Sequence, residues 1–313
     1  MSLTNLLSSV VVAAVALGAV PAFAADGANL DISVYNPGEK GIFAVSSEIV
    51  SGPTEVALVD AQFSTADAAA LVAAIKATGK RLKLVYISHS DPDFYFGLET
   101  IRAAFPDVSI VATPQTVAAI KASKDGKLAF WGPILKDNAP KTVIVPEALD
   151  GDTFSVDGKE LKIVGLDGPS PDRTFLWVPS SKAVIGGIPV LANEHVWIAD
   201  TQTLVSRANW KSTLDAIVAL KPDLVVPGHY LPNADGSKPF TLASVQFTRD
   251  YLDAVEAEAA KATTSAELIA AMQKRYPGLA GESSLETSAK VIKGEMKWPA
   301  EYRGDGAPGE PHE

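Results

Sequence analysis

The order of predicted strands and helices along this chain indicates an α/β fold built around parallel strands. Between residues 55 and 122, short apolar strands alternate with helices, with boundaries marked by Gly79, Pro106 and Pro114. Because a strand that is followed by a crossover helix pairs in parallel with the next strand, this order predicts a parallel sheet covered by helices. From residue 153 onward the theme repeats, with strands first and helices after them. The 313 residues, 47 % of them hydrophobic and 20 % charged, suffice to bury a substantial core.

Hydrophobic patterning predicts the elements of the first half. Strands are expected at 30–35, 41–50, 55–59, 82–87 and 108–112, and helices at 68–77, 94–105 and 115–122. Ser64 is a suitable N-cap for the first helix, with Asp67 in the first turn, and Pro114 suits the start of the third. We read residues 123–140 as an irregular segment pinned to the core or to a pocket by its aromatic residues.

The second half is expected to begin with a hairpin through Asp157 and Gly158, a pair typical of tight hairpin turns. Further strands are predicted at 174–178, 183–185 and 224–226, and helices at 203–220, 241–262 and 265–275.

The N-terminal segment has the pattern of a secretory signal peptide. An apolar run from Leu6 to Val20 precedes Ala22-Phe23-Ala24, a small-x-small cleavage pattern, although the segment contains no Lys or Arg. The run is shorter than the roughly 20 residues that span a bilayer, so integral membrane association after cleavage is not expected. We therefore predict a signal peptide at 1–24, one domain at 25–303, a disordered tail at 304–313, and a periplasmic or secreted location.

Charge and cysteine content narrow the function classes. A formal net charge of −10 disfavours binding to the phosphate backbone, so we expect a small-molecule substrate or ligand and no nucleic acid. The chain has no cysteine, which excludes disulfides, thiolate metal sites and cysteine nucleophiles. Any metal would have to be held by His, Asp, Glu or backbone oxygen. The sequence does not determine the oligomeric state.

The segment from Val85 to Gly97 is a predicted buried strand that runs into a polar loop and then opens a helix. From His89 the loop reads His-Ser-Asp-Pro-Asp-Phe-Tyr-Phe-Gly. It resembles the metal-binding loop of the metallo-β-lactamase superfamily, His-x-His-x-Asp-His-x-x-Gly, and segments 167–174, 184–187 and 227–229 are similar to other parts of that family's site. The resemblance covers nearly the whole chain after the leader and implies an αββα four-layer sandwich, with the active site at the sheet edge.

In register with that family, the chain keeps only part of the ligand set. The matching positions that retain ligand chemistry are His89, Asp93 and His229, and Asp91, which replaces a histidine. The positions that have lost it are Phe94, Pro169 and Ile188. Two metals that share a bridging carboxylate would need about seven ligands, so four residues disfavour a dinuclear site.

Two alternatives remain for the metal. One divalent ion, Zn with Mn or Fe as the other candidates, could be held by His89, Asp91, Asp93 and His229. Equally, the chain could bind no metal, with Asp91 as a turn residue, Asp93 as the N-cap of the following helix, and the histidines hydrogen-bonded.

We predict Asp93 and His195 as catalytic residues. Asp93 could orient the attacking water, and His195 lies just after the Gly-Gly strand end, where it could face the same cleft. The resemblance implies an exported hydrolase of a small ester, lactone or amide with an atypical, at most mononuclear metal site. The alternative is a non-catalytic small-molecule-binding protein that reuses a drier cleft. A third hypothesis is metal-independent acid–base chemistry by Asp91, Asp93 and His195.

Overall fold

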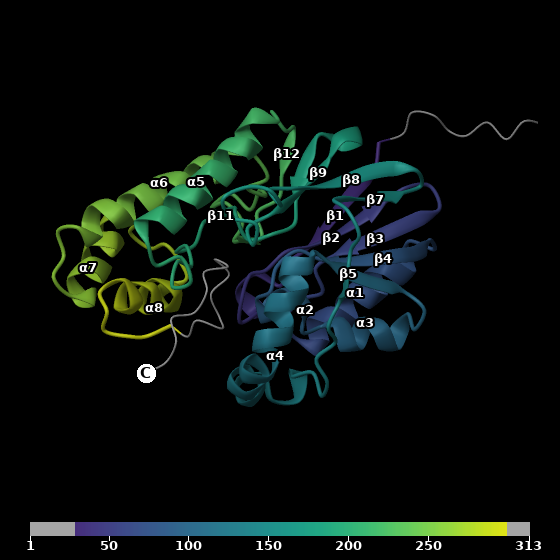
Figure 1. Ribbon diagram of the computed structural model, residues 1–313, viewed down its shortest axis with the longest axis horizontal. Helices are drawn as coiled ribbons and strands as arrows, with labels where there is room; N and C mark the ends of the chain where they lie inside the picture. The colour runs from purple at the N-terminus through teal and green to yellow at the C-terminus, as the bar shows by residue number, and fades with distance from the viewer. Residues whose placement is uncertain (1–28, 299–313) are drawn as a thin grey trace, which may run out of the picture.

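The computed structural model describes residues 29–298, so the predicted signal peptide and the tail at 304–313 lie outside the described residues. Two β-sheets lie face to face, with helices on the outer face of each (Figure 1). The N-terminal half supplies one sheet with α1 to α4, and the C-terminal half supplies the other with α5 to α8. The predicted αββα four-layer sandwich is confirmed.

The first sheet has six strands in chain order, β1 to β6. They are β1 (Asp31–Tyr35), β2 (Ser47–Ser51), β3 (Glu55–Val59), β4 (Arg81–Ile87), β5 (Ser109–Ala112) and β6 (Glu147–Ala148). The first three pair antiparallel, and β3 to β6 pair in parallel, as the strand–helix alternation predicts.

The second sheet has the strand order β12-β10-β9-β8-β7, and a separate two-stranded ladder joins β11 to β13. Its elements are β7 (Thr153–Val156), β8 (Lys159–Val164), β9 (Phe175–Val178), β10 (Ala183–Ile185) and β12 (Leu224–Val225), with β11 (Leu191–Ala192) and β13 (His229–Tyr230) in the ladder. The predicted hairpin is present, and Asp157 and Gly158 both adopt positive φ at its turn.

The helices cover the outer faces of the two sheets. They are α1 (Thr65–Ala77), α2 (Pro92–Tyr95), α3 (Leu98–Ala104), α4 (Pro114–Leu135), α5 (Leu204–Ala219), α6 (Leu242–Ala259), α7 (Ser265–Arg275) and α8 (Glu282–Ile292). As predicted, Ser64 caps α1 and accepts a hydrogen bond from the backbone N–H of Asp67.

Three hydrophobic clusters correspond to the three interfaces between the four layers. Leu71 and Ile75 of α1 pack with the outer face of the first sheet. Val59 and Tyr86 meet Leu176 of the second sheet in the space between the sheets. The third cluster joins the second sheet to α5, α6, α7 and α8. Burial on both faces explains why the central strands are apolar throughout.

The largest difference from the sequence prediction is the length of α4. We expected an irregular segment at 123–140, but the helix runs on to Leu135 and includes Pro133 near its end. Its buried face combines apolar residues with Ser123 and Lys127, spaced as one stripe of a helix. The prediction was wrong because two polar residues occupy that stripe, and a hydrophobic pattern does not register them.

Two smaller corrections concern the segments around the polar loop and the C-terminus. The helix predicted at 94–105 is divided into α2 and α3 by Phe96 and Gly97. The N-cap of α2 is Asp91 and not Asp93, which lies in the first turn. The sequence reading also missed α8 and the short strands β11 and β13.

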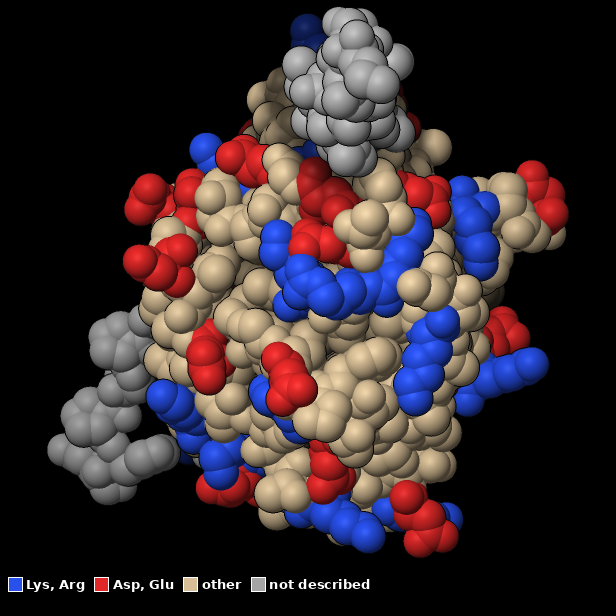
Figure 2. Space-filling view, turned by 90° about the vertical axis from the view of Figure 1, so that its right-hand side faces the viewer, with Lys and Arg blue, Asp and Glu red and all other residues tan. Residues whose placement is uncertain are grey.

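The charge of the surface and the hydropathy of the helices bear on the expected partners. Lys and Arg side chains are interspersed with Asp and Glu side chains on the face shown in Figure 2, so that face is not uniformly basic. Within residues 29–298, no helix is long and apolar enough to cross a membrane.

A buried pair of carboxyl groups lies between the sheets, where β2 and β3 approach the Gly186 turn. Burial and the charge of Asp60 raise the pKa of Glu48 to about 8, against the opposing effect of the polar groups of Ser46 and Gly186 nearby. Burial also raises the pKa of Asp60 to about 7. At neutral pH, Glu48 is therefore largely protonated in the folded protein and ionised in the unfolded chain.

We expect Glu48→Gln to flatten the pH dependence of stability. The folded pKa of Glu48 exceeds its unfolded value, so the wild-type free energy of unfolding falls as pH rises from about 5 to about 8. Glutamine cannot ionise, so the variant gains stability relative to wild type, by a few kcal/mol at the alkaline end. Urea unfolding across this pH range measures the difference. Exposed Glu160→Gln is the control, and parallel curves for all three proteins would contradict the assignment.

Candidate functional site

A chain of hydrogen bonds fixes the ends of three strands at one edge of the sandwich. The carboxylate of Asp60, directly after β3, accepts from the backbone N–H and from the hydroxyl of Ser88, at 2.8 and 2.6 Å. The same hydroxyl accepts the backbone N–H of Gly187, just after β10, at 2.8 Å. Because β3 and β4 belong to one sheet and β10 to the other, this chain joins the loops of both halves.

Gly97 sets the position of the polar loop that follows β4. Its N–H donates to the carbonyl of Gln62, and the N–H of Ala61 donates to the carbonyl of Phe94. A Cβ on Gly97 would lie 1.9 Å from the carbonyl oxygen of Ala61. The glycine of the sequence motif is therefore required for close approach of two backbones, and this approach holds α2 and Asp93 in place.

His89 is buried and uncharged at neutral pH. Burial, together with the charges of Arg173 and Lys127 and against that of Asp91, lowers the pKa of His89 to about 4. Its Nδ1 accepts the backbone N–H of Asp91 at 3.2 Å, which assigns the proton to Nε2. Among the described residues, this Nε2 has no hydrogen-bond partner. His89 therefore presents an N–H to its surroundings and not a lone pair.

Asp91 is paired with a lysine from the outer helix layer. The Nζ of Lys127, in α4, lies 3.3 Å from Oδ1 of Asp91 and donates to the carbonyl of Ser90 at 2.7 Å. Burial raises the pKa of Asp91, but the interactions with His89, Lys127 and Arg173 together hold that pKa below its ordinary value. Asp91 is thus an anion with a protein counter-cation.

The second contact pair joins Asp93 to His229 and extends to Glu194. Oδ2 of Asp93 lies 3.0 Å from Nε2 of His229, and Oε1 of Glu194 lies 3.7 Å from Nδ1. Burial would lower the pKa of His229, but the hydrogen bond and charge of Asp93 and the charges of Glu194 and Asp91 raise it. Burial raises the pKa of Glu194 to about 7, opposed by His229 and assisted by Asp93.

Backbone pairing fixes the position of His229, whose side chain contacts Asp93. His229 begins β13, which pairs in parallel with β11, and it also bridges to Val45. A Cβ on the preceding Gly228 would lie 2.1 Å from the carbonyl of Gly187, so this glycine also permits a close approach. The imidazole is thus held by the backbone of both halves.

The three positions that had lost ligand chemistry have different surroundings. The Phe94 ring is buried and contacts the rings of both His89 and His229, with centroids 5.5 and 5.6 Å apart. Ile188 is buried in the core of the first half. Pro169 is exposed, and its carbonyl accepts a hydrogen bond from Asn209. Phe94 therefore places an apolar ring against both histidines.

As arranged, these residues do not fit a divalent ion. Direct contacts join the four predicted ligands as two pairs, His89–Asp91 and Asp93–His229. Within residues 29–298, no three His, Asp or Glu side chains are grouped closely enough to hold a metal. The lone pair of His89 is engaged by a backbone N–H, and the ammonium of Lys127 pairs with Asp91. Of the two alternatives left by the sequence, this donor arrangement favours the one without a metal.

His195, predicted as catalytic, contacts Tyr251 and not Asp93 or His229 in the described interactions. Its Nδ1 lies 2.8 Å from the hydroxyl of Tyr251 in α6, and burial lowers its pKa. The structure adds Glu194, Lys127 and Arg173, which sequence reasoning had not assigned. Glu194 was within reach of that reasoning, since it directly precedes His195. Lys127 gave no signal beyond its helical spacing in a segment that we read as irregular.

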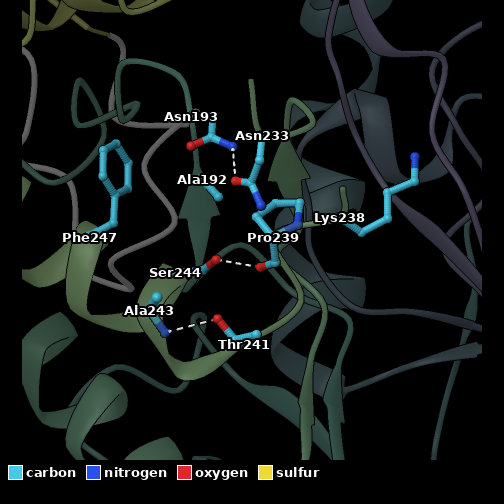
Figure 3. Close-up of a pocket in the computed structure, with 9 residues that line it drawn as sticks. All are labelled: Ala192, Asn193, Asn233, Lys238, Pro239, Thr241, Ala243, Ser244 and Phe247. Atoms are coloured by element: carbon cyan, nitrogen blue, oxygen red, sulfur yellow. Dashed lines mark hydrogen bonds between the residues drawn. The ribbon is translucent and has the colours of Figure 1, made fainter. Parts of the chain in front are cut away.

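A hollow of about 130 Å³ lies elsewhere, where α6 begins beside β11 (Figure 3). Its polar groups bind one another: Asn193 donates to Asn233 at 3.0 Å, and the hydroxyl of Ser244 donates to the carbonyl of Pro239. Neither Asp93 nor His229 lines it. The hollow is therefore distinct from the candidate site.

The chain is similar to one protein family and to several solved structures. Residues 41–229 match the family model of the metallo-beta-lactamase superfamily. Among solved structures, a metallo-beta-lactamase from Pontibacter korlensis is 18 % identical, with a TM-score of 0.48, over 72 % of this chain and 93 % of that chain. The DIM-1 metallo-beta-lactamase is 20 % identical, with a TM-score of 0.48, over 72 % and 98 %. No curated protein matches the chain.

We expect Gly97→Ala to destabilise the protein, because the new Cβ would overlap the carbonyl of Ala61. Backbone shifts forced by overpacking cost about 1–3 kcal/mol in the free energy of unfolding. The matched control is Gly132→Ala in α4, where a Cβ would meet nothing within 4 Å. Denaturant unfolding compares the two variants, and equal stabilities would contradict the close approach at Gly97.

Proposed function

The chain belongs to the metallo-β-lactamase superfamily, and from this premise we propose that it is an exported hydrolase of small esters, lactones or amides. The observation that carries the proposal is the contact of Asp93 with His229, backed by Glu194, at the edge where the loops of both halves meet. A carboxylate and an imidazolium in direct contact are the components of general acid–base catalysis.

The accessibility of the site supports a small substrate. The side chains of Asp93, His229 and Glu194 are 6 %, 12 % and 15 % exposed, so each is partly accessible to water. Partial burial strengthens the electrostatic effect of each charge on its neighbours. Hydrolysis by members of the superfamily usually depends on a bound metal. The donor arrangement of this chain does not fit a divalent ion, so we assign the chemistry to protein groups alone.

The proposed roles follow from the contacts of each group. Asp93 orients a water molecule through the carboxylate oxygen that does not contact His229, and accepts its proton as the water attacks the acyl carbon. His229, whose pKa is raised by its two carboxylate neighbours against the effect of burial, donates a proton as the imidazolium to the leaving oxygen or nitrogen as the acyl bond breaks. Glu194 is a positioning residue that acts through His229.

We expect Asp93→Asn and His229→Gln each to lower kcat/KM by about 10²–10⁴-fold, the usual contribution of a general acid or base. The measurement uses a panel of chromogenic aryl esters, lactones, amides and a β-lactam. The control is Asp107→Asn, at an exposed turn. Wild-type rates in both variants would contradict these roles, provided that melting temperatures show the variants to be folded.

The pH profile distinguishes a positioning role of Glu194 from a purely structural one. Glu194→Gln removes a negative charge that raises the pKa of His229. The imidazolium is then lost at lower pH, so the alkaline limb of the kcat/KM profile moves toward lower pH. Exposed Glu160→Gln should leave the profile unchanged. An unshifted limb in Glu194→Gln would remove Glu194 from the proposal.

The buried Phe94 ring against both histidines favours one second candidate, a non-catalytic small-molecule-binding protein. An apolar wall with a few fixed polar groups is typical of ligand pockets. This candidate predicts no turnover of the panel and a rise in melting temperature with a bound aromatic or lipidic ligand. Turnover by wild type that Asp93→Asn abolishes decides for the hydrolase.

Export rests on the apolar run and the Ala22-Phe23-Ala24 pattern of the leader. If the leader is cleaved after Ala24, the protein recovered from the periplasm or medium begins at Ala25. Intact-mass measurement of the expressed full-length chain tests this, and a protein that retains residues 1–24 in the cytoplasm would contradict export.

A further inference from the structure

The carboxylates that follow β4, with Asp93 buried and Asp91 partly buried, require counter-cations. Taking a carboxylate out of water costs several kcal/mol unless a positive charge and hydrogen bonds compensate. In a metal-binding loop of this kind, a divalent ion supplies that charge. Here Asp91 and Asp93 leave the same strand end, Asp93 is 4 % exposed, and the described residues form no group that holds an ion.

Lys127 supplies a positive charge at Asp91. It is 4 % exposed, although lysine is rarely buried without a partner. Its ammonium contacts the loop twice, at the carbonyl of Ser90 and at the carboxylate of Asp91. Lys127 belongs to α4, in the outer layer of the first half, so the long side chain carries its charge inward to the site edge.

Arg173 supplies a second fixed charge from the other half of the molecule. It is 3 % exposed, donates to Asp200 at 2.8 Å and to Thr201 at 2.6 Å, and lies over the ring of Trp210 at 4.1 Å. Its charge acts on Asp91 from this position. Two immobilised cations, one from each half, therefore act on the charge of Asp91.

We propose that Lys127, supported by Arg173, is the resident counter-cation of the loop from His89 to Asp93, in place of a metal ion. The loop is then preformed without divalent ions, and the ammonium excludes an ion from Asp91. This inference rests on the Lys127–Asp91 geometry and not on the proposed hydrolase activity, because its readouts are metal content and thermal stability.

The first measurement uses wild-type protein purified without chelator. Elemental analysis should find Zn, Mn and Fe far below one ion per chain. The melting temperature should be the same in EDTA and in excess Zn²⁺ or Mn²⁺, because a ligand that binds the native state would raise it. A stoichiometric ion, or a melting temperature that falls in EDTA, would overturn the proposal.

The second measurement compares variants of one helix. Lys127→Met leaves the partly buried Asp91 without its cation, and we expect the melting temperature to fall by about 5–10 °C. The matched control, Lys121→Met, removes an exposed lysine of α4 and should change little. Excess Zn²⁺ or Mn²⁺ should raise the melting temperature of Lys127→Met only, since Asp91 is then free to bind a cation.

A double variant keeps the test decisive if Lys127→Met folds poorly. Adding Asp91→Asn removes the stranded charge, so Lys127→Met/Asp91→Asn should recover most of the lost stability. Such recovery supports the ion pair. If the double variant is no more stable than Lys127→Met, or if Lys127→Met behaves like Lys121→Met, the counter-cation role is wrong.

Discussion

The hydrogen-bonded chain from Asp60 through Ser88 to Gly187 is the constraint on which the rest of the site depends. Asp60 is buried and adopts a positive φ, a strained conformation that the surrounding contacts maintain. Its two bonds from Ser88 fix the end of β4, and the Ser88 hydroxyl fixes the turn after β10. Because the hydroxyl of Ser88 contacts both halves, it fixes the loops that carry the site relative to one another.

At this edge of the sandwich, the two halves contribute charges that neutralise one another. The first half provides Lys127, which pairs with Asp91, and Asp93, which contacts His229 of the second half. The second half adds Glu194 beside His229, and the Arg173–Asp200 pair. Alternating positive and negative groups lower the cost of burying each one. In this chain the protein's own cations provide the compensation that metal ions provide in typical members of the superfamily.

The sequence predicted the elements of the fold whose signals are local. The strand at 55–59 and the helix at 265–275 have the predicted bounds, because apolar patterning and capping residues define them without help from distant contacts. The helix α4 was shortened in the prediction because Ser123 and Lys127 interrupt its apolar stripe. Their burial depends on partners elsewhere in the chain, such as the carbonyl of Ser90, and these partners are invisible to a local pattern.

The sequence by itself determined the family, the loss of ligand chemistry at Phe94 and Ile188, and the positions of the polar residues along the chain, because these follow from residue identity and spacing. Only the tertiary structure decided which polar residues meet. Asp93 contacts His229 of the second half, and Asp91 pairs with Lys127 of α4. The reason is physical: the protonation state and counter-charge of a buried group depend on neighbours that folding brings from distant segments.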